Sequence, residues 1–107
     1  MKADLGQLMR QAQKAQEAMK RLQAEIAQAE ATGEAGAGMV KITLNGKHEA
    51  RKVEIAAEAL QESKDFLEDL VAAAINDASQ KLERSASEKM AKLTGGLQLP
   101  PGFNLGM

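Results

Sequence analysis

The chain has 107 residues, a net charge of -1 at pH 7 and no cysteine. A fold of this length buries only about two thirds of the surface that its unfolded chain exposes, so we expect one domain without a deep catalytic cleft. Without cysteine, the chain has neither disulfides nor thiolate metal ligands to supplement a small core. These properties argue against an enzyme, and we expect no catalytic residue, metal, cofactor or small-molecule substrate.

The start of the sequence carries no apolar targeting segment. Met1–Asp4 leads straight into polar, helix-forming residues, and the chain holds no run of about 18 apolar residues that could span a membrane. We therefore expect a cytoplasmic protein with no membrane partner.

The first predicted element is a long helix. Apolar residues recur at alternating gaps of three and four, the spacing of a coiled-coil seam. These residues are Leu5, Leu8, Ala12, Ala15, Met19, Leu22, Ile26 and Ala29. Asp4 can cap the N-terminus of this helix, and Thr32-Gly33 is expected to stop it. Because alanine buries little surface, the helix needs a closely packed partner.

The next segment predicts two strands. Glycine alternates with small residues from 33 to 38, which favours a weak strand approached closely by another backbone. Val40, Ile42 and Leu44 then alternate with polar residues, which is typical of a strand with one buried face.

A hairpin is predicted to follow. Asn45-Gly46 favours a tight type I′ turn, in which both residues adopt positive φ. The return strand is expected to run from about residue 47 to 55. Val53 and Ile55 are out of parity with His48 and Ala50. If both pairs face the core, one extra residue must be absorbed near Arg51, so a β-bulge is expected there.

The last predicted element is a second long helix. A short helical turn over Ala56–Gln61 precedes it, and Ser63 can cap it. Its apolar side is wide enough to cover a sheet as far as Ile75 and narrows beyond Ala78. We therefore expect the near half to pack on the sheet and the far half to project.

Together these elements predict a single α+β domain of order α-β-β-β-α, with two long helices and a small antiparallel sheet. The expected divisions are a helical arm (1–31), a sheet (32–56), helices (57–94) and an extended tail (95–107).

The charges are distributed unevenly along the chain. Residues 1–21 carry five bases and two acids, residues 49–77 eight acids and three bases, and residues 78–107 four bases and two acids. If the two long helices run antiparallel from one sheet, both basic ends meet far from the strands, where they could bind the phosphates of double-stranded DNA. The candidate DNA-binding residues are Lys2, Arg10, Lys14, Lys20, Arg21, Lys81, Arg84, Lys89 and Lys92.

The same pattern has a plainer interpretation, because bases directed away from a seam are common on solvated helix faces. Sequence-specific readout is not expected, since no helix-turn-helix spacing is visible. With neither Trp nor Tyr, the chain also lacks a stacking platform for single strands. Any DNA target is thus expected to be a duplex bound with low sequence specificity.

Two further candidate sites are weak. His48 is the only histidine, and one histidine without cysteine rarely makes a metal or catalytic site. Glu58, Glu62, Asp65 and Asp69 recur at helical gaps and could bind a divalent cation. A solvated helix face and a favourable N-terminus for the second long helix explain these acids better.

Five stretches that run nearly from end to end carry a family resemblance: Leu8–Lys14, Thr32–Gly38, Asn45-Gly46, Leu67–Ala78 and Leu99–Phe103. The fourth stretch, together with the Pro-Pro-Gly-Phe tail, is the most specific part. Through them the chain resembles the YbaB/EbfC family of nucleoid-associated proteins. The resemblance implies a tweezer-shaped homodimer in the bacterial nucleoid that binds double-stranded DNA and affects DNA conformation, nucleoid organisation or gene expression.

Two other functions fit the same predicted architecture. Long paired helices joined by hairpin sequence also describe prefoldin-like holdase chaperones, which would expose apolar residues at the helix tips. The candidates are Leu5, Leu8, Met9, Met90 and Leu93. A protein-assembly scaffold would instead bind its partner through the apolar tail. The basic character of the tips favours DNA binding over the chaperone, and the scaffold is the least expected of the three functions.

Overall fold

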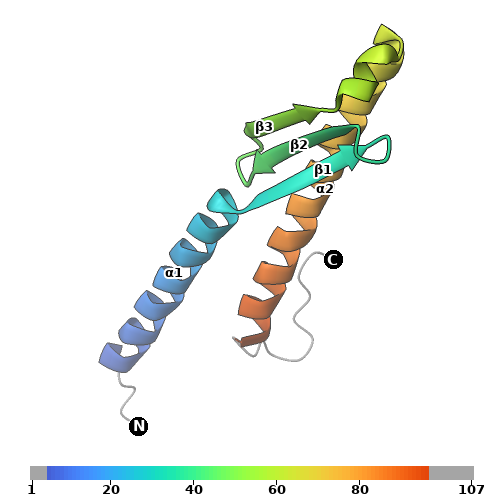
Figure 1. The fold of residues 1–107 in the computed structure, drawn as a ribbon. Coiled ribbons are helices and arrows are strands. Elements are labelled where there is room, and N and C mark those ends of the chain that lie inside the picture. Colours follow the sequence, from blue (N-terminus) through green and yellow to red (C-terminus); the bar gives the residue numbers. More distant parts are fainter. Residues whose placement is uncertain (1–4, 97–107) are drawn as a thin grey trace.

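The computed structural model describes residues 5–96, and the predicted order of elements is confirmed. The elements are α1 (Leu5–Gln28), β1 (Glu30–Ala35), β2 (Val40–Asn45), β3 (Ala50–Ile55), a 3-10 helix η1 (Ala57–Gln61) and α2 (Lys64–Gly96). The strands form an antiparallel sheet of order β1-β2-β3, and α2 runs along one face of it (Figure 1). Lys2, the expected Asp4 cap and the apolar tail from 97 to 107 lie outside the described residues.

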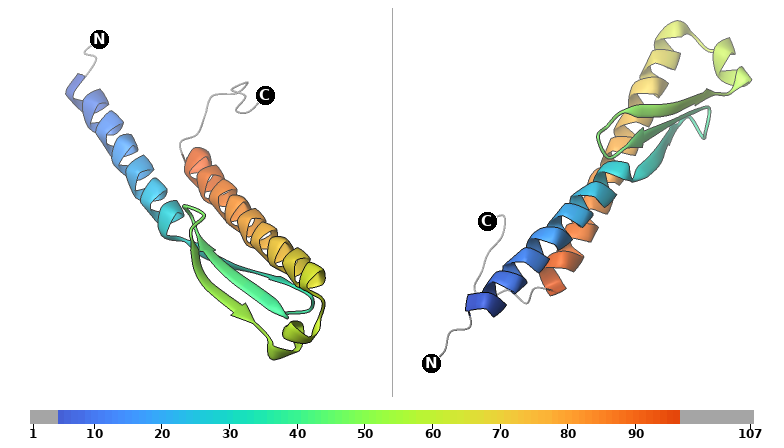
Figure 2. Two further views of the ribbon diagram at one scale, coloured as in Figure 1. Left: turned by 90° about the horizontal axis from the view of Figure 1, so that it is seen from above. Right: turned by 90° about the vertical axis from the view of Figure 1, so that its left-hand side faces the viewer.

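The molecule is elongated, with principal extents of 75 × 27 × 16 Å. α1 and the C-terminal half of α2 project from the same end of the sheet, and η1 lies toward the other end (Figures 1 and 2). The expectation that the near half of the second helix packs and the far half projects is therefore confirmed.

The core forms between α2 and the apolar face of β2. Val40, Ile42 and Leu44 are buried, as their alternation with polar residues predicts. They pack in one cluster with a stripe along α2 made of Leu70, Ala74, Ala78 and Leu82. Because two of these four residues are alanines, the helix axis lies close to the sheet.

β1 lies directly under α2 because Gly33 has no side chain. A Cβ at this position would overlap the carbonyl oxygen of Ala74 and the backbone nitrogen of Ala78. Ala31 and Ala35, the neighbours of Gly33 on the same face, are small enough to pack beside it. The predicted close approach of another backbone to the glycine-rich segment is thus confirmed at Gly33.

Side chains of α2 also close the outer edge of β1. The Lys81 Nζ donates to the Thr32 carbonyl oxygen (2.9 Å), and the Glu34 backbone N–H donates to Asp77 Oδ2 (3.0 Å). The Asp77 carboxylate and the Lys81 ammonium form an ion pair (3.2 Å) between these two contacts. Two outward-facing backbone groups of this edge strand are therefore bound by the helix that covers it.

The expected stop of the first helix at Thr32-Gly33 is wrong. The helix ends at Gln28, and β1 begins two residues later, so Thr32 and Gly33 lie within a strand. The reason is tertiary: the Gly46 N–H of the β2–β3 loop donates to the Ala27 carbonyl oxygen (3.2 Å) in the last turn of α1. Contact with this loop ends the helix before its local stop signal.

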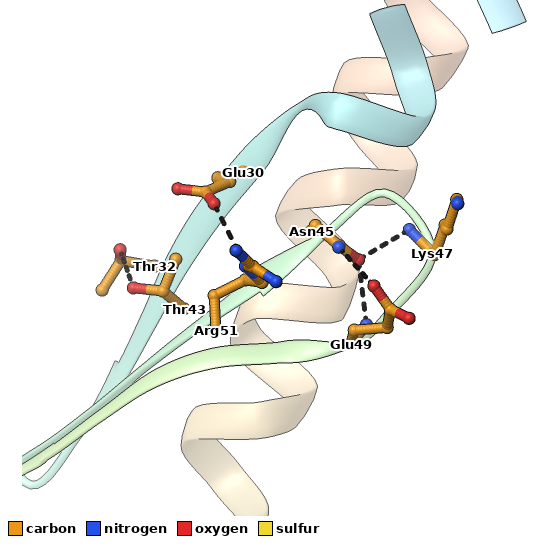
Figure 3. Close-up of polar contacts among 7 residues, drawn as sticks. All are labelled: Glu30, Thr32, Thr43, Asn45, Lys47, Glu49 and Arg51. Atoms are coloured by element: carbon orange, nitrogen blue, oxygen red, sulfur yellow. Dashed lines mark hydrogen bonds and ion pairs between the residues drawn. The ribbon is translucent and has the colours of Figure 1, made fainter. Parts of the chain in front are cut away.

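The prediction of a type I′ turn at Asn45-Gly46 is also wrong. The loop has three residues between the paired Asn45 and Glu49, and its left-handed residue is His48, at φ 63°. Asn45 shapes the loop, because its Oδ1 accepts the backbone N–H groups of Lys47 (2.9 Å) and Glu49 (3.0 Å), as Figure 3 shows. Gly46 is required for space, since a Cβ there would overlap the Ile26 carbonyl of α1.

The glycine-rich segment expected to form one weak strand is divided. Its first half lies in β1, whereas Gly36, Ala37 and Gly38 form the turn to β2, with φ of 64°, 54° and 90°. Left-handed backbone favours glycine, which explains why the segment alternates glycine with a small residue.

Two local predictions are confirmed. β3 pairs with β2 so that Ala50 faces Leu44 and Lys52 faces Thr43, which leaves Arg51 as the extra residue of a bulge. At the start of α2, Ser63 Oγ accepts the backbone N–H of Phe66 (3.1 Å), as a helix N-cap does.

We expect Gly33→Ala to lower the free energy of unfolding by about 1–3 kcal/mol, because the added methyl group must push β1 away from α2. Chemical denaturation measures the effect. Gly95→Ala is the control, since nothing lies within 4 Å of a Cβ at that position. Equal stability of the two variants would contradict the close contact.

Candidate nucleic-acid interface

A groove of about 420 Å³ lies between α1 and the projecting half of α2. Leu22, which is buried, and Leu93, which is half-buried, contribute its apolar lining. The full lining is Ala18, Arg21, Leu22 and Glu25 from α1 and Lys89, Lys92 and Leu93 from α2. The two long helices thus share one concave surface although they come from opposite ends of the sequence.

Three of the nine predicted DNA-binding residues converge on this groove. Arg21 comes from α1, and Lys89 and Lys92 come from α2. Arg21 and Lys92 are exposed, and Lys89 is half-buried. Glu25 is the only acid among the lining residues, so the groove carries a net positive charge. Such a surface attracts anions such as phosphate groups.

The positive surface continues along α1 beyond the groove. Arg10 and Lys14 precede Arg21 by about three and two helical turns, which places them on the same side of the helix. Both side chains are exposed. Glu17 lies on the same side between Lys14 and Arg21, so the stripe that extends toward the N-terminal end of α1 holds three bases and one acid.

The remaining predicted bases have other surroundings. Lys20 and Arg84 are exposed but do not line the groove. Lys81 contacts Thr32 and Asp77, so its ammonium fastens α2 to the edge of β1. Lys2 lies outside the described residues.

A second groove holds bases that the sequence analysis missed. It has a volume of about 490 Å³ and lies between the last turns of α1 and the β2–β3 hairpin. Lys47 and Arg51 line it, and Arg51 Nε lies 3.9 Å from Glu30 Oε2 (Figure 3). No local pattern marks these residues, because only the packing of the hairpin against α1 brings them there.

One group of acids lies away from the grooves. Glu58, Glu62, Asp65 and Asp69 are exposed on η1, in the link that follows it and at the start of α2, at the opposite end of α2 from Lys89 and Lys92. Within residues 5–96, no group of three His, Asp or Glu side chains is arranged to hold a metal ion. The end of α2 near η1 is therefore acidic, whereas Lys89 and Lys92 lie toward its other end.

No helix within residues 5–96 is both long and apolar enough to cross a membrane.

The described residues define an α+β protein in which two long helices carry bases on both sides of a groove and acids lie at the far end. This charge distribution suits a protein that binds a polyanion. A model of the YbaB/EbfC DNA-binding family matches residues 1–97, and the chain belongs to that family. The resemblance drawn from the sequence is thus confirmed, and the family is one of nucleoid-associated DNA-binding proteins and not one of enzymes.

A solved structure has the same fold. It is the crystal structure of an uncharacterised protein, HP0035, from Helicobacter pylori. The two chains are 21% identical, with a TM-score of 0.67 over 85% of this chain and 97% of that one. The α-β-β-β-α arrangement therefore recurs in a distant sequence.

Asp77 predicts a pH dependence of stability. The Glu34 backbone N–H and the Lys81 ammonium, which both contact its carboxylate, hold the pKa of Asp77 below its ordinary value of 3.8. A carboxylate with a lowered pKa in the fold stabilises it fully above the pKa of the unfolded chain, and this stabilisation is lost as the pH falls through the folded pKa. We therefore expect the stability advantage of wild type over Asp77→Asn to be constant near neutral pH and to shrink below 3.8.

Thermal denaturation of both proteins across a pH series measures this difference. Asp69→Asn, a change at an exposed position of α2, is the control. An advantage that stays constant through the acid range would show that the Asp77 carboxylate contributes nothing to the closed edge of β1.

Proposed function

We propose that the protein binds duplex DNA with low sequence specificity, as a homodimer whose helical arms contact the phosphate backbone. The observation that carries this proposal is the groove in which Arg21, Lys89 and Lys92 converge from two helices. Membership of the DNA-binding family supports it. In the cytoplasm, such binding would act on DNA conformation, nucleoid organisation or gene expression.

Low specificity follows from the kind of side chain available. Contacts of Lys and Arg with phosphates position a protein on DNA but carry no sequence information. In a helix-turn-helix protein, the recognition helix packs against a short helix across a tight turn. The bases of α1 instead lie on an exposed helix whose neighbour is the long α2. The acids around η1 are repelled by DNA, which would orient the molecule with its basic arms toward the duplex.

Uncovered apolar side chains support the homodimer. α2 packs on β1 and β2, and the apolar side chains of β3, Val53 and Ile55, remain 54% and 41% exposed. Phe66 and Ile75 on α2 are 41% and 40% exposed. Phe66 lies nine residues before Ile75 and therefore on the opposite side of the helix. Val53, Ile55 and Ile75, here called the apolar face, would be covered if α2 of a second copy packed beside the first. A two-fold axis would then present two pairs of basic arms.

We expect binding to a 30-base-pair duplex of arbitrary sequence to weaken with salt, with a log-log slope of about -4 to -7. Arg21→Ala/Lys92→Ala should reduce the steepness of this slope by about 1–2, because each lost phosphate contact removes about 0.9. Fluorescence anisotropy across a salt series measures both slopes.

Lys41→Ala/Lys64→Ala is the matched control, since it removes the same charge from exposed positions away from the arms. If wild type fails to bind at low salt, or if the arm variant binds as well as the control, the arms are only solvated helix faces. A second duplex of scrambled sequence should compete equally with the first, and strong preference would contradict low specificity.

The homodimer predicts that Ile75→Glu, which places a charge in the apolar face, yields monomers in sedimentation velocity. DNA affinity should fall with it, because a monomer presents only one pair of arms. Gln80→Glu adds the same charge at an exposed position of α2 and should leave the dimer intact. A dimeric Ile75→Glu protein would mean that this face is not the interface.

A holdase chaperone is the second candidate, because Leu5, Leu8 and Met9 at the start of α1 are 68%, 56% and 65% exposed. Met90 is also exposed, whereas Leu93 is half-buried. Salt separates the two functions, since apolar contacts with an unfolded client are not screened but phosphate contacts are. Suppression of aggregation that persists at high salt would favour the chaperone.

A further inference from the structure

The two edge strands of the sheet differ in what contacts their outward-facing backbone groups. On β1, the outward-facing carbonyl of Thr32 and N–H of Glu34 are bound by side chains of α2. On β3, no strand within the described residues pairs with the outer side. The molecule therefore closes one edge of its sheet and leaves the other accessible.

The register identifies which backbone groups of β3 face outward. The Ala56 N–H donates to the Met39 carbonyl (2.8 Å), and the Asn45 N–H donates to the Glu49 carbonyl (3.0 Å). Because alternate residues of an antiparallel pair bond to the neighbouring strand, the odd-numbered residues of β2 bond to β3. Lys41 and Thr43 face Glu54 and Lys52. The backbone N–H and C=O groups of Val53 and Ile55 accordingly point away from β2, toward the free side.

The side chains around Val53 are self-complementary in charge. Lys52 and Glu54 lie on the polar face of the sheet, 66% and 54% exposed, and form an ion pair with each other (3.8 Å). If a two-fold axis passes beside Val53, this residue faces its own copy, and Lys52 faces Glu54 of the second copy twice. Axes centred on Lys52 or on Glu54 would instead place like charges opposite each other, which is unfavourable. Of these three registers, the one centred on Val53 is thus selected.

Sheet edges are often protected against such pairing by lysines and by bulges. β3 has both, but its bulge lies at Arg51, before the Lys52–Glu54 segment. Its charges also differ in sign on the two sides of Val53, so two copies attract in the selected register where a row of lysines would repel. The features that usually prevent self-association therefore do not prevent it here.

We propose that β3 pairs antiparallel with β3 of a second copy, centred on Val53, and so joins the two sheets edge to edge. This contact uses the outward backbone groups of β3, whereas the proposed dimer covers the side chains of the apolar face, so it would link one dimer to the next. Its consequence on DNA rests on the proposed function: neighbouring dimers on a duplex would be linked into a continuous array. A few ladder bonds make a small, weak interface, and binding to one duplex strengthens it by raising the effective concentration.

The test uses two charge reversals in the full chain, Lys52→Glu and Glu54→Lys. Each places like charges opposite each other at both flanks of Val53, and we expect association beyond the dimer to weaken on the order of tenfold. An equimolar mixture of the two variants should restore association, because the acidic edge of one chain then faces the basic edge of the other. The double variant Lys52→Glu/Glu54→Lys should also associate as wild type does.

Sedimentation velocity across a concentration series without DNA measures association, and circular dichroism verifies that each variant is folded. Restoration by mixing supports the pairing, since a folding defect in either variant could not be repaired by the other. The proposal is overturned if single variants associate as wild type does, if the mixture stays unassociated, or if wild type stays dimeric throughout and binds long DNA without cooperativity.

A separate measurement keeps this result distinct from the proposed function. Binding to a short duplex that holds one dimer should be equal for wild type and the charge-balanced double variant. Loss of cooperativity on long DNA with short-duplex binding retained in the single variants is the outcome expected of the edge contact. Absence of all DNA binding would instead remove the proposed function and leave the edge pairing to be judged from sedimentation alone.

Discussion

The contact between Gly33 and the backbone of α2 sets the position of most other parts of the molecule. Because a Cβ at this position would overlap Ala74 and Ala78, only glycine lets β1 lie directly under the helix. α2 then covers β1 and β2 and not β3. The side chains of Asp77 and Lys81 reach the backbone of β1 for the same reason. If α2 lay further from the sheet, the side chains of Asp77 and Lys81 would not reach the backbone of β1. The helix would then also not be shifted toward β1 and away from β3.

A second close contact determines the direction of α1. Gly46 at the tip of the β2–β3 hairpin lies against the last turn of the helix, and its N–H binds the Ala27 carbonyl. This contact aligns α1 with the projecting half of α2 (Figure 2). The groove that holds Arg21, Lys89 and Lys92 therefore depends on a hairpin that contributes none of those bases. Glycines at two positions thus fix the geometry of the candidate site without contacting a ligand.

The elongated shape lets opposite charges act separately. The long axis measures 75 Å, whereas electrostatic interactions in water are screened over about 8–10 Å at physiological salt. The bases on the arms are therefore not neutralised by the acids near η1, although the chain as a whole carries a net charge of only -1. Net charge alone would have argued against a nucleic-acid-binding protein, and the fold explains why it is a poor guide here.

The sequence by itself determined the features that depend on neighbouring residues. The seam spacing predicted α1, the alternation around Ile42 predicted β2, the parity of Val53 and Ile55 predicted the bulge, and Ser63 predicted the start of α2. Each follows from local periodicity or from one hydrogen bond within a turn. The family, too, was recognisable from local stretches.

Only the tertiary structure decided the features that depend on residues distant in sequence. The end of α1 and the shape of the loop after Asn45 follow from the contact between hairpin and helix, so their local signals were misleading. Lys81 is fastened to the edge of β1, and Lys47 lines a groove that no sequence pattern indicates. The exposure of the apolar side chains of β3 could not be predicted from the sequence either. Alternation shows that one face of a strand is apolar, but it does not show which helix, if any, covers that face.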